Sequence, residues 1–198
     1  TGTQAGLETV PSNYHNAFAS IYEGRYLAGV AAGLKIKEMI DSGKIKKEDA
    51  VIGYVGAFPY AEVVSGYTSF FLGARSVCPD VTMKVRYTRT WYDYTKEKQA
   101  AESLIKNDKC VLISQHADSM GAPSACEQKG VPNVSYNGST YSACPDTFMI
   151  SSAINWAPYM LYVAKCVNTG ATIDTDWCGD IAANSVVLSG LNQGVAAE

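Results

Sequence analysis

The apolar positions between Asn13 and Gly43 recur at helical spacing, which predicts one long helix. Asn13 can cap the start of this helix, and Gly43 ends or follows it. The small residues from Ala28 to Gly33 give the predicted helix a face on which another element can pack closely. The apolar residues that define the period are Phe18, Ile21, Tyr22, Leu27, Val30 and Leu34.

Beyond this helix, short apolar runs bounded by turn residues alternate with longer segments of helical period. This alternation predicts an α/β fold in three layers, a parallel sheet with helices on both faces. The tail after Thr172 is mixed in character, with Val186 to Leu188 as a lone strand. The other expected strands are 51–55, 81–87, 111–114, 131–136 and 148–151, and the expected helices are 61–76, 95–107, 123–129 and 157–167.

In parallel sheets of this kind, ligands bind where strands end and helices begin. Five polar or aromatic segments follow directly on predicted strands, so we expect them to gather at one edge of the sheet. These segments are Phe58-Pro59, Trp91-Tyr92-Asp93, His116-Ala117-Asp118-Ser119, Tyr136-Asn137-Gly138 and Asn155-Trp156.

Composition narrows the possible function. The 198 residues are 47% hydrophobic and 18% charged, which is enough to bury a core. The net charge of −3 is spread along the chain without a Lys/Arg stripe, which argues against a nucleic-acid or anionic-membrane surface. No apolar run is long enough for a membrane span, and the chain opens on Thr1-Gly2-Thr3 without a signal peptide.

The sequence contains six cysteines, none in a CxxC pair or at zinc-finger spacing, so we predict no metal site. An even number is compatible with an oxidising compartment and slightly favours disulfides, although free cysteines are also common in cores. Cys166 and Cys178 flank a predicted helix end and could meet. The other four are Cys78, Cys110, Cys126 and Cys144.

Enzyme signatures are sparse. The sequence has no GxSxG elbow, Walker loop or HExxH motif, and we predict no catalytic residue. His15 falls near a helix start and is expected at the surface. His116 beside Asp118 could act in general acid/base chemistry, as a binding pair, or as a satisfied core histidine.

Trp91 follows a strand and could be either a core plug or a stacking face for a flat ligand. Phe58 has the same two interpretations. Asp118 and Asn137 are short polar side chains at strand ends, where they could contact a ligand or cap a helix. One aromatic face with an acid and an amide on its rim describes a site for a small planar heterocycle that carries N–H donors.

Five stretches, in the same order along residues 13–195, resemble motifs of the basic membrane lipoprotein (BMP) family of solute-binding proteins. The first, EGRYLAG at 23–29, is similar to the family's YEARYLAG. The others are VGAFP at 55–59 followed by Glu62-Val63, RTWYD at 89–93 with KEK at 96–98, QHADS at 115–119 and NWAPY at 155–159.

The resemblance implies a type I periplasmic-binding fold of two α/β lobes joined by hinge strands, with the ligand clamped between them. The match covers only the second lobe. It therefore implies a linker to an N-terminal lobe at 1–12, a ligand-binding lobe at 13–170, and a return segment at 171–198. A signal and a lipid-anchor cysteine would lie before Thr1, and the isolated lobe would expose cleft and hinge surface that favours self-association.

In function, the resemblance implies an extracytoplasmic receptor on the cell membrane that passes a purine to an ABC permease without a cofactor. The family's base-stacking aromatic falls at Trp91, its ribose-binding carboxylate at Asn137 and its ribose-binding lysine at Ile154. Because both charged ribose contacts are lost, we expect a free nucleobase such as adenine over a nucleoside. The candidate ligand-binding residues are Trp91, Asp118, Asn137, Phe58, His116, Asn155 and Trp156.

Two other function classes remain open. The same fold serves as the effector-sensing lobe of transcription regulators, for which a helix-turn-helix before Thr1 would be decisive. A small flavodoxin-like enzyme using His116 and Asp118 is a third possibility, which turnover by the chain would support.

Overall fold

The computed structural model of the chain describes residues 10–196, so most of the predicted 1–12 linker lies outside the described residues. Five longer helices, one short 3-10 helix and eight strands alternate along it. The helices are α1 (Ile21–Asp41), a 3-10 turn (Lys47–Asp49), α2 (Ala61–Val77), α3 (Tyr94–Lys106), α4 (Gly121–Lys129) and α5 (Ala157–Thr169). The strands are β1 (Asn16–Ala19), β2 (Val51–Gly56), β3 (Thr82–Tyr87), β4 (Leu112–His116), β5 (Asn133–Tyr136), β6 (Phe148–Ile154), β7 (Asp176–Gly179) and β8 (Val186–Leu188).

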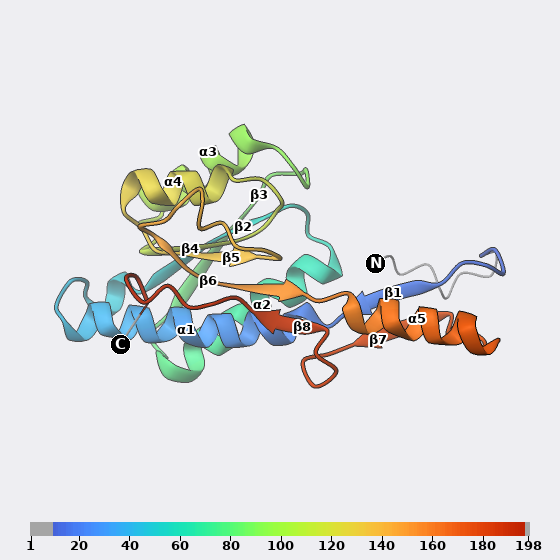
Figure 1. Cartoon of the computed structure of the whole chain (residues 1–198). Helices are drawn as coiled ribbons and strands as arrows, with labels where there is room; N and C mark the ends of the chain where they lie inside the picture. Colours follow the sequence, from blue (N-terminus) through green and yellow to red (C-terminus); the bar gives the residue numbers. More distant parts are fainter. Residues whose placement is uncertain (1–9, 197–198) are drawn as a thin grey trace.

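Six strands form the central sheet, in the order β3-β2-β4-β5-β6-β8. The first five are parallel, and α1 with α2 covers one face while α3 with α4 covers the other (Figure 1). Every residue of β4 is buried, as expected for a central parallel strand covered on both faces. The predicted three-layer α/β fold is therefore confirmed.

The last strand differs from the prediction of a lone strand. β8 pairs with β6 in the antiparallel direction, with Val186 opposite Ile154. A three-residue apolar run carries no information about its partner, which lies more than thirty residues earlier in the chain.

A second, smaller unit lies outside the central sheet. β1 and β7 form a two-stranded parallel sheet that projects from the α/β body together with α5 (Figure 1). β1 and α5 fall within the range 13–170 that we predicted to be one lobe. However, β1 pairs with β7 outside the six-stranded sheet, and α5 contacts β7. The strand β7 was not predicted.

The prediction of a helix starting at Asn13 is wrong. Residues 16–19 are extended because Asn16 N donates to Thr175 O (2.8 Å) and Ser20 N donates to Gly179 O (2.8 Å). Pairing with a strand about 160 residues later overrides the local helical period. The helix α1 begins only at Ile21, after Ser20.

The helix α1 buries its small residues together with Ile21, Ile36 and Met39. An added Cβ at Gly29 would lie 2.1 Å from the carbonyl oxygen of Phe70, and one at Gly73 would lie 2.0 Å from that of Tyr26. The backbones of α1 and α2 therefore cross almost in contact, which explains the small-residue face. The large side chains Tyr22, Leu27 and Leu34, which defined the predicted period, are exposed.

The predicted disulfides do not form. All six cysteines are free, and five of them are buried as small core residues. Cys178 does not reach Cys166; its Sγ lies 3.4 Å from the Ser20 hydroxyl instead. Two cysteines that flank a helix end can be near one another in sequence, but a disulfide also needs matched side-chain directions.

Candidate functional site

Three aromatic side chains form a wall at the carboxyl end of the sheet. Phe58 and Tyr60 come from the β2–α2 loop, and Trp91 comes from the β3–α3 loop. The Phe58 and Tyr60 rings are stacked with centroids 4.9 Å apart, and the Trp91 ring lies 5.9 Å from Phe58 and 6.4 Å from Tyr60. We call Phe58, Tyr60 and Trp91 the aromatic wall.

Behind the aromatic wall lies a second aromatic layer. The His116 ring at the end of β4 is 6.3 Å from Trp91, and it stacks on Tyr136 at the end of β5 with centroids 3.8 Å apart. Glu62 in the first turn of α2 joins them: its Oε1 accepts from the Tyr136 hydroxyl (3.4 Å) and lies 3.8 Å from His116 Nε2. His116 is fully buried, so it supports the site from below.

Glu97 on α3 fixes the loop that carries Asp118. Its carboxylate is fully buried and accepts from the Ser119 backbone N–H at 3.1 and 3.2 Å and from the Asp93 N–H at 3.3 Å. Asp118 N donates to Trp91 O (2.8 Å), so the loops after β3 and β4 are tied together. Asp93 caps α3 by accepting from Lys96 N.

Asp118 and Asn137, the two polar rim residues, differ in the hydrogen bonds that they make within the chain. The helix after Asp118, α4, starts at Gly121, whose N–H donates to the Ser119 hydroxyl (3.2 Å) and not to Asp118, and the Asp118 side chain is exposed. Asn137 has a left-handed backbone (φ 55°), which asparagine tolerates, and its Oδ1 accepts from Ile154 N (3.3 Å). Asn137 therefore joins the ends of β5 and β6, and its Nδ2 stays available.

A hollow of about 380 Å³ lies beside these residues. Asp118 and Asn137 both line it, and they follow the neighbouring strands β4 and β5. Its lining consists of Gln115, Ala117, Asp118, Ser119, Met120, Tyr136, Asn137, Gly138, Ser139 and Thr140.

Burial sets the protonation of this region. It lowers the pKa of His116, an effect that Glu62 partly offsets, so the imidazole is neutral. Burial, and then the Glu62 charge, raise the pKa of Asp118. The His116 ring and the Tyr136 hydroxyl in turn hold the pKa of Glu62 below its usual range.

A buried cation lies under the floor of the site. Arg25 of α1 is fully buried, donates to Ser135 O (2.8 Å) and to the Tyr54 hydroxyl (3.2 Å), and lies 4.8 Å from the Phe70 ring centroid. It also donates to the Ser114 hydroxyl. Among the described residues Arg25 makes no ion pair, so hydrogen bonds and aromatic faces alone hold its charge.

The predicted site residues fall into two groups. Phe58, Trp91 and His116 lie together, and Asp118 and Asn137 line the adjoining hollow. Asn155 and Trp156 do not line this hollow: the Asn155 amide donates to Asn184 O and accepts from Ala157 N, and the Trp156 ring lies 6.4 Å from that of Tyr159. Tyr159 in turn lies 5.1 Å from Trp177 of the β1–β7 unit.

Sequence reasoning did not single out Tyr60, Glu62, Glu97 or Tyr136 as functional residues. Glu62 and Tyr136 did fall within stretches that drew attention, one in a motif and the other at a strand end. Glu97 also fell within a motif, the KEK stretch at 96–98, but a glutamate in a helix is usually exposed, and only the fold shows that this one is buried.

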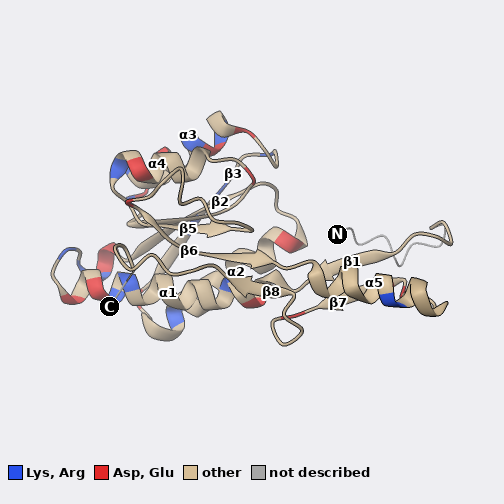
Figure 2. Ribbon diagram, viewed as in Figure 1, with Lys and Arg blue, Asp and Glu red and all other residues tan. Residues whose placement is uncertain are grey.

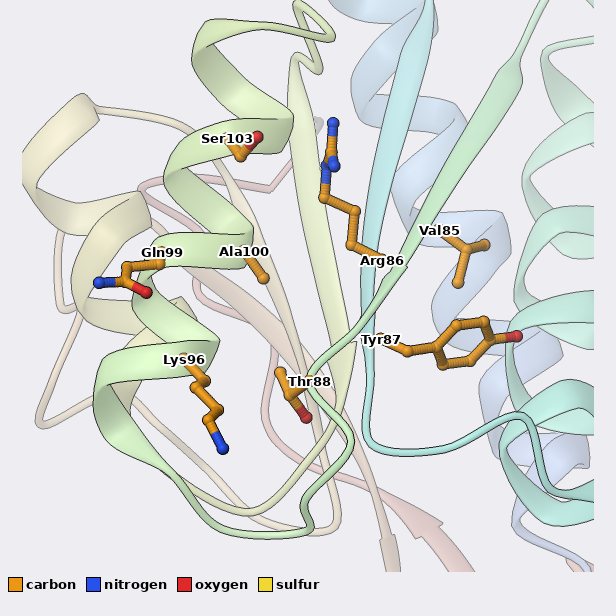
Figure 3. Close-up of a pocket in the computed structure, with 8 residues that line it drawn as sticks. All are labelled: Val85, Arg86, Tyr87, Thr88, Lys96, Gln99, Ala100 and Ser103. Atoms are coloured by element: carbon orange, nitrogen blue, oxygen red, sulfur yellow. The ribbon is translucent and has the colours of Figure 1, made fainter.

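Another hollow, of about 450 Å³, lies between the edge strand β3 and α3 (Figure 3). Its charged side chains already have partners: Arg86 is bonded to Asp108 at 2.6 Å, and Lys96 lies 3.5 Å from Asp93. Nothing there resembles the convergent aromatic and polar groups of the first site. Within residues 10–196, no three His, Cys, Asp or Glu side chains cluster as metal ligands, and no helix has the length and apolar character to cross a bilayer.

Comparisons with known proteins show the family and the fold of the chain. Residues 7–177 match the family model described as ABC transporter substrate-binding protein PnrA-like (Bmp). A purine-binding protein of Brucella abortus is 37% identical over 153 residues, which are 77% of this chain and 40% of that protein. A putative ABC transporter glucose-binding protein of Haloferax volcanii is 35% identical over 160 residues, 80% of this chain and 38% of that protein.

Among solved structures, an ABC transporter solute-binding protein from Aeropyrum pernix K1 superposes with a TM-score of 0.77 at 16% identity, over 92% of this chain and 52% of that chain. This likeness shows the fold. The chain spans about two fifths of the length of the two curated relatives. The family expected from the five motifs is confirmed: the chain belongs to the Bmp family of PnrA-like ABC transporter substrate-binding proteins.

Proposed function

We propose that the chain is one lobe of an extracytoplasmic receptor that binds a purine nucleobase such as adenine and delivers it to an ABC permease. The observation that carries this proposal is the aromatic wall of Phe58, Tyr60 and Trp91 with the Asp118 carboxylate beside it. A flat ring can stack on the wall while its amino group donates to the carboxylate.

The two curated relatives are named for different ligands, one for purines and one for glucose. The described site favours the purine. Its recognition surface is a face of aromatic rings with a carboxylate rim, which suits a planar ligand that donates N–H bonds. Asn137 and Ile154 carry no charge where nucleoside receptors of this family hold the ribose, which favours the free base.

The β1–β7 unit supports a place for this chain within a larger clamp. A two-stranded sheet is marginally stable alone, and α5 leaves large apolar side chains in solvent, including Leu161 at 71% and Val167 at 68%. We infer that this unit packs into a second lobe, with the aromatic wall facing the cleft between the lobes.

Titration calorimetry of the full-length protein with adenine, hypoxanthine, inosine and glucose tests the proposal. We expect adenine to bind tightest and inosine weakly. Binding of glucose without any binding of adenine would refute a purine receptor. Inosine binding more tightly than adenine would refute the preference for a free base.

A further inference from the structure

Glu62 lies next to the aromatic wall and has no assigned role. It stands in the first turn of α2, two residues after Tyr60, where Figure 2 shows an acidic turn at the start of the helix. Its side chain keeps 27% of its surface exposed, so solvent reaches the carboxylate. The Tyr136 hydroxyl donates to it, and the Tyr136 ring lines the same hollow as Asp118.

The surroundings of Glu62 leave hydrogen-bonding capacity unused. Neither ring nitrogen of His116 has a hydrogen-bond partner within the described part of the chain, although both are fully buried. His116 Nε2 lies 3.8 Å from Glu62 Oε1, slightly beyond bonding distance. A buried polar group without a partner is costly, so a closer approach of Glu62 to His116 would be favourable.

The charged side chain that lines the hollow is acidic. Neither lysine nor arginine appears among the residues that line the hollow, while Asp118 does. Arg25 is fully buried beneath the floor with its hydrogen bonds made inside the protein. The guanidinium of Arg89, in the loop that carries Trp91, packs over the Tyr87 ring at 5.8 Å.

We propose that Glu62 is a second ligand-facing carboxylate which, together with Asp118, selects ligands that present N–H donors on two edges and rejects anionic ligands such as nucleoside phosphates. This proposal rests on the purine-binding function proposed above and deepens it. Tyr136 connects the two carboxylates, because its hydroxyl donates to Glu62 and its side chain lines the same hollow as Asp118.

The negative charge of the two carboxylates determines which ligands the site favours. A carboxylate accepts from an amino group or ring N–H, but it repels a carbonyl oxygen. Two carboxylates also repel a phosphate, since no lysine or arginine lines the described hollow and the buried Arg25 donates its hydrogen bonds within the protein. Glu62 should therefore raise the affinity for aminopurines, raise that for oxopurines less, and lower that for phosphorylated ligands.

The test compares Glu62→Gln with wild type in the full-length protein. Glutamine keeps the length of the side chain and an oxygen that can accept from Tyr136, while it removes the charge. We expect adenine affinity to fall about tenfold, which corresponds to roughly 1.4 kcal/mol, and the preference for adenine over hypoxanthine to narrow. Adenosine 5′-monophosphate and adenosine differ only in the phosphate. The variant should therefore bind the monophosphate more tightly, relative to adenosine, than wild type does.

The matched control is Glu102→Gln on α3, which removes a carboxylate outside the site and should change neither ratio. An unchanged adenine-to-hypoxanthine ratio in Glu62→Gln would overturn the proposal. If that variant does not fold, a salt series on wild type replaces it. Salt should then raise the affinity for adenosine 5′-monophosphate relative to adenosine, and a flat or falling ratio would contradict repulsion by the site.

The outcomes separate this inference from the proposed function. If the wild-type protein binds no purine, the proposed function is refuted. Wild-type protein that binds adenine, with a Glu62→Gln variant of unchanged selectivity, would remove only the role of Glu62.

Discussion

The imidazole ring of His116 lies against the phenol ring of Tyr136, with centroids 3.8 Å apart and an angle of 29° between the ring planes. The stack joins the ends of β4 and β5 directly beneath the rim that carries Asp118 and Asn137. Because the imidazole is fully buried and the Arg25 guanidinium, which has no ion-pair partner among the described residues, also acts on it, a second positive charge there would be unfavourable. The floor of the site therefore depends on a neutral His116.

This dependence gives the stability of the fold a predictable pH profile. Burial holds the folded-state pKa of His116 below its unfolded value of about 6.5. As pH falls below about 6.5, the unfolded chain takes up a proton that the folded chain refuses, so stability falls. The contribution is fully present above the unfolded pKa and is lost as pH falls toward the folded pKa.

Urea denaturation between about pH 5 and 7.5 measures the effect, whose slope can reach about 1.4 kcal/mol per pH unit. His116→Gln should flatten this slope relative to wild type, because glutamine does not titrate. His15→Gln, which changes the other histidine of the sequence, is the control. Equal slopes for wild type and His116→Gln would show that His116 is not the group responsible.

Trp91 should carry much of the ligand affinity, because it is the largest ring of the aromatic wall. Trp91→Ala in the full-length protein should weaken adenine binding by about 1–3 kcal/mol, as the loss of a base–aromatic stack does. Tyr92→Ala is a close control, since Tyr92 is the next residue and is 72% exposed. Calorimetry that gave the same affinity for Trp91→Ala and wild type would remove Trp91 from the site.

Glu97 should matter for both stability and binding, although it touches no ligand. Glu97→Ala leaves the N–H groups of Ser119 and Asp93 without their acceptor, at a cost of about 1–3 kcal/mol for each buried group. Denaturation should show this loss, and adenine binding should weaken because the Asp118 loop is no longer fixed. Glu102→Ala on the same helix should change little, and an equal effect of both substitutions would mean that helix propensity is the cause.

Most of the central sheet could be predicted from sequence, because each buried strand is a short apolar run and each covering helix has its own period. The rim positions Trp91 and Asp118 followed from the rule that ligands bind at strand ends. These inferences use only local patterns, which a chain carries in consecutive residues.

The features that sequence could not predict depend on distant partners. β1 is a strand because β7 lies beside it, and the Asn155 amide has its partners in Asn184 and Ala157. Glu97 and Arg25 look like ordinary surface charges until the fold buries them. Long-range pairing and burial therefore explain both the wrong helix start and the missed site residues.

The openness of the site in this chain leads to a last prediction. Tyr60 is 55% exposed, and ligand sites usually bury 70–90% of the ligand surface, which one lobe cannot do alone. Stacking and a few hydrogen bonds must also offset a loss of translational and rotational freedom of at least roughly 4 kcal/mol. The 198-residue chain should therefore bind adenine no better than about 1 mM, or roughly −4 kcal/mol.

Tryptophan fluorescence titrated with adenine checks this expectation, with the full-length protein as the comparison. The exposed apolar side chains of α5, such as Leu161, also favour self-association of the isolated chain, so sedimentation should accompany the titration. Saturation at micromolar adenine by a monomeric sample would mean that this lobe alone encloses the ligand. The second lobe would then have no part in binding, and the exposed face of α5 would need a different explanation.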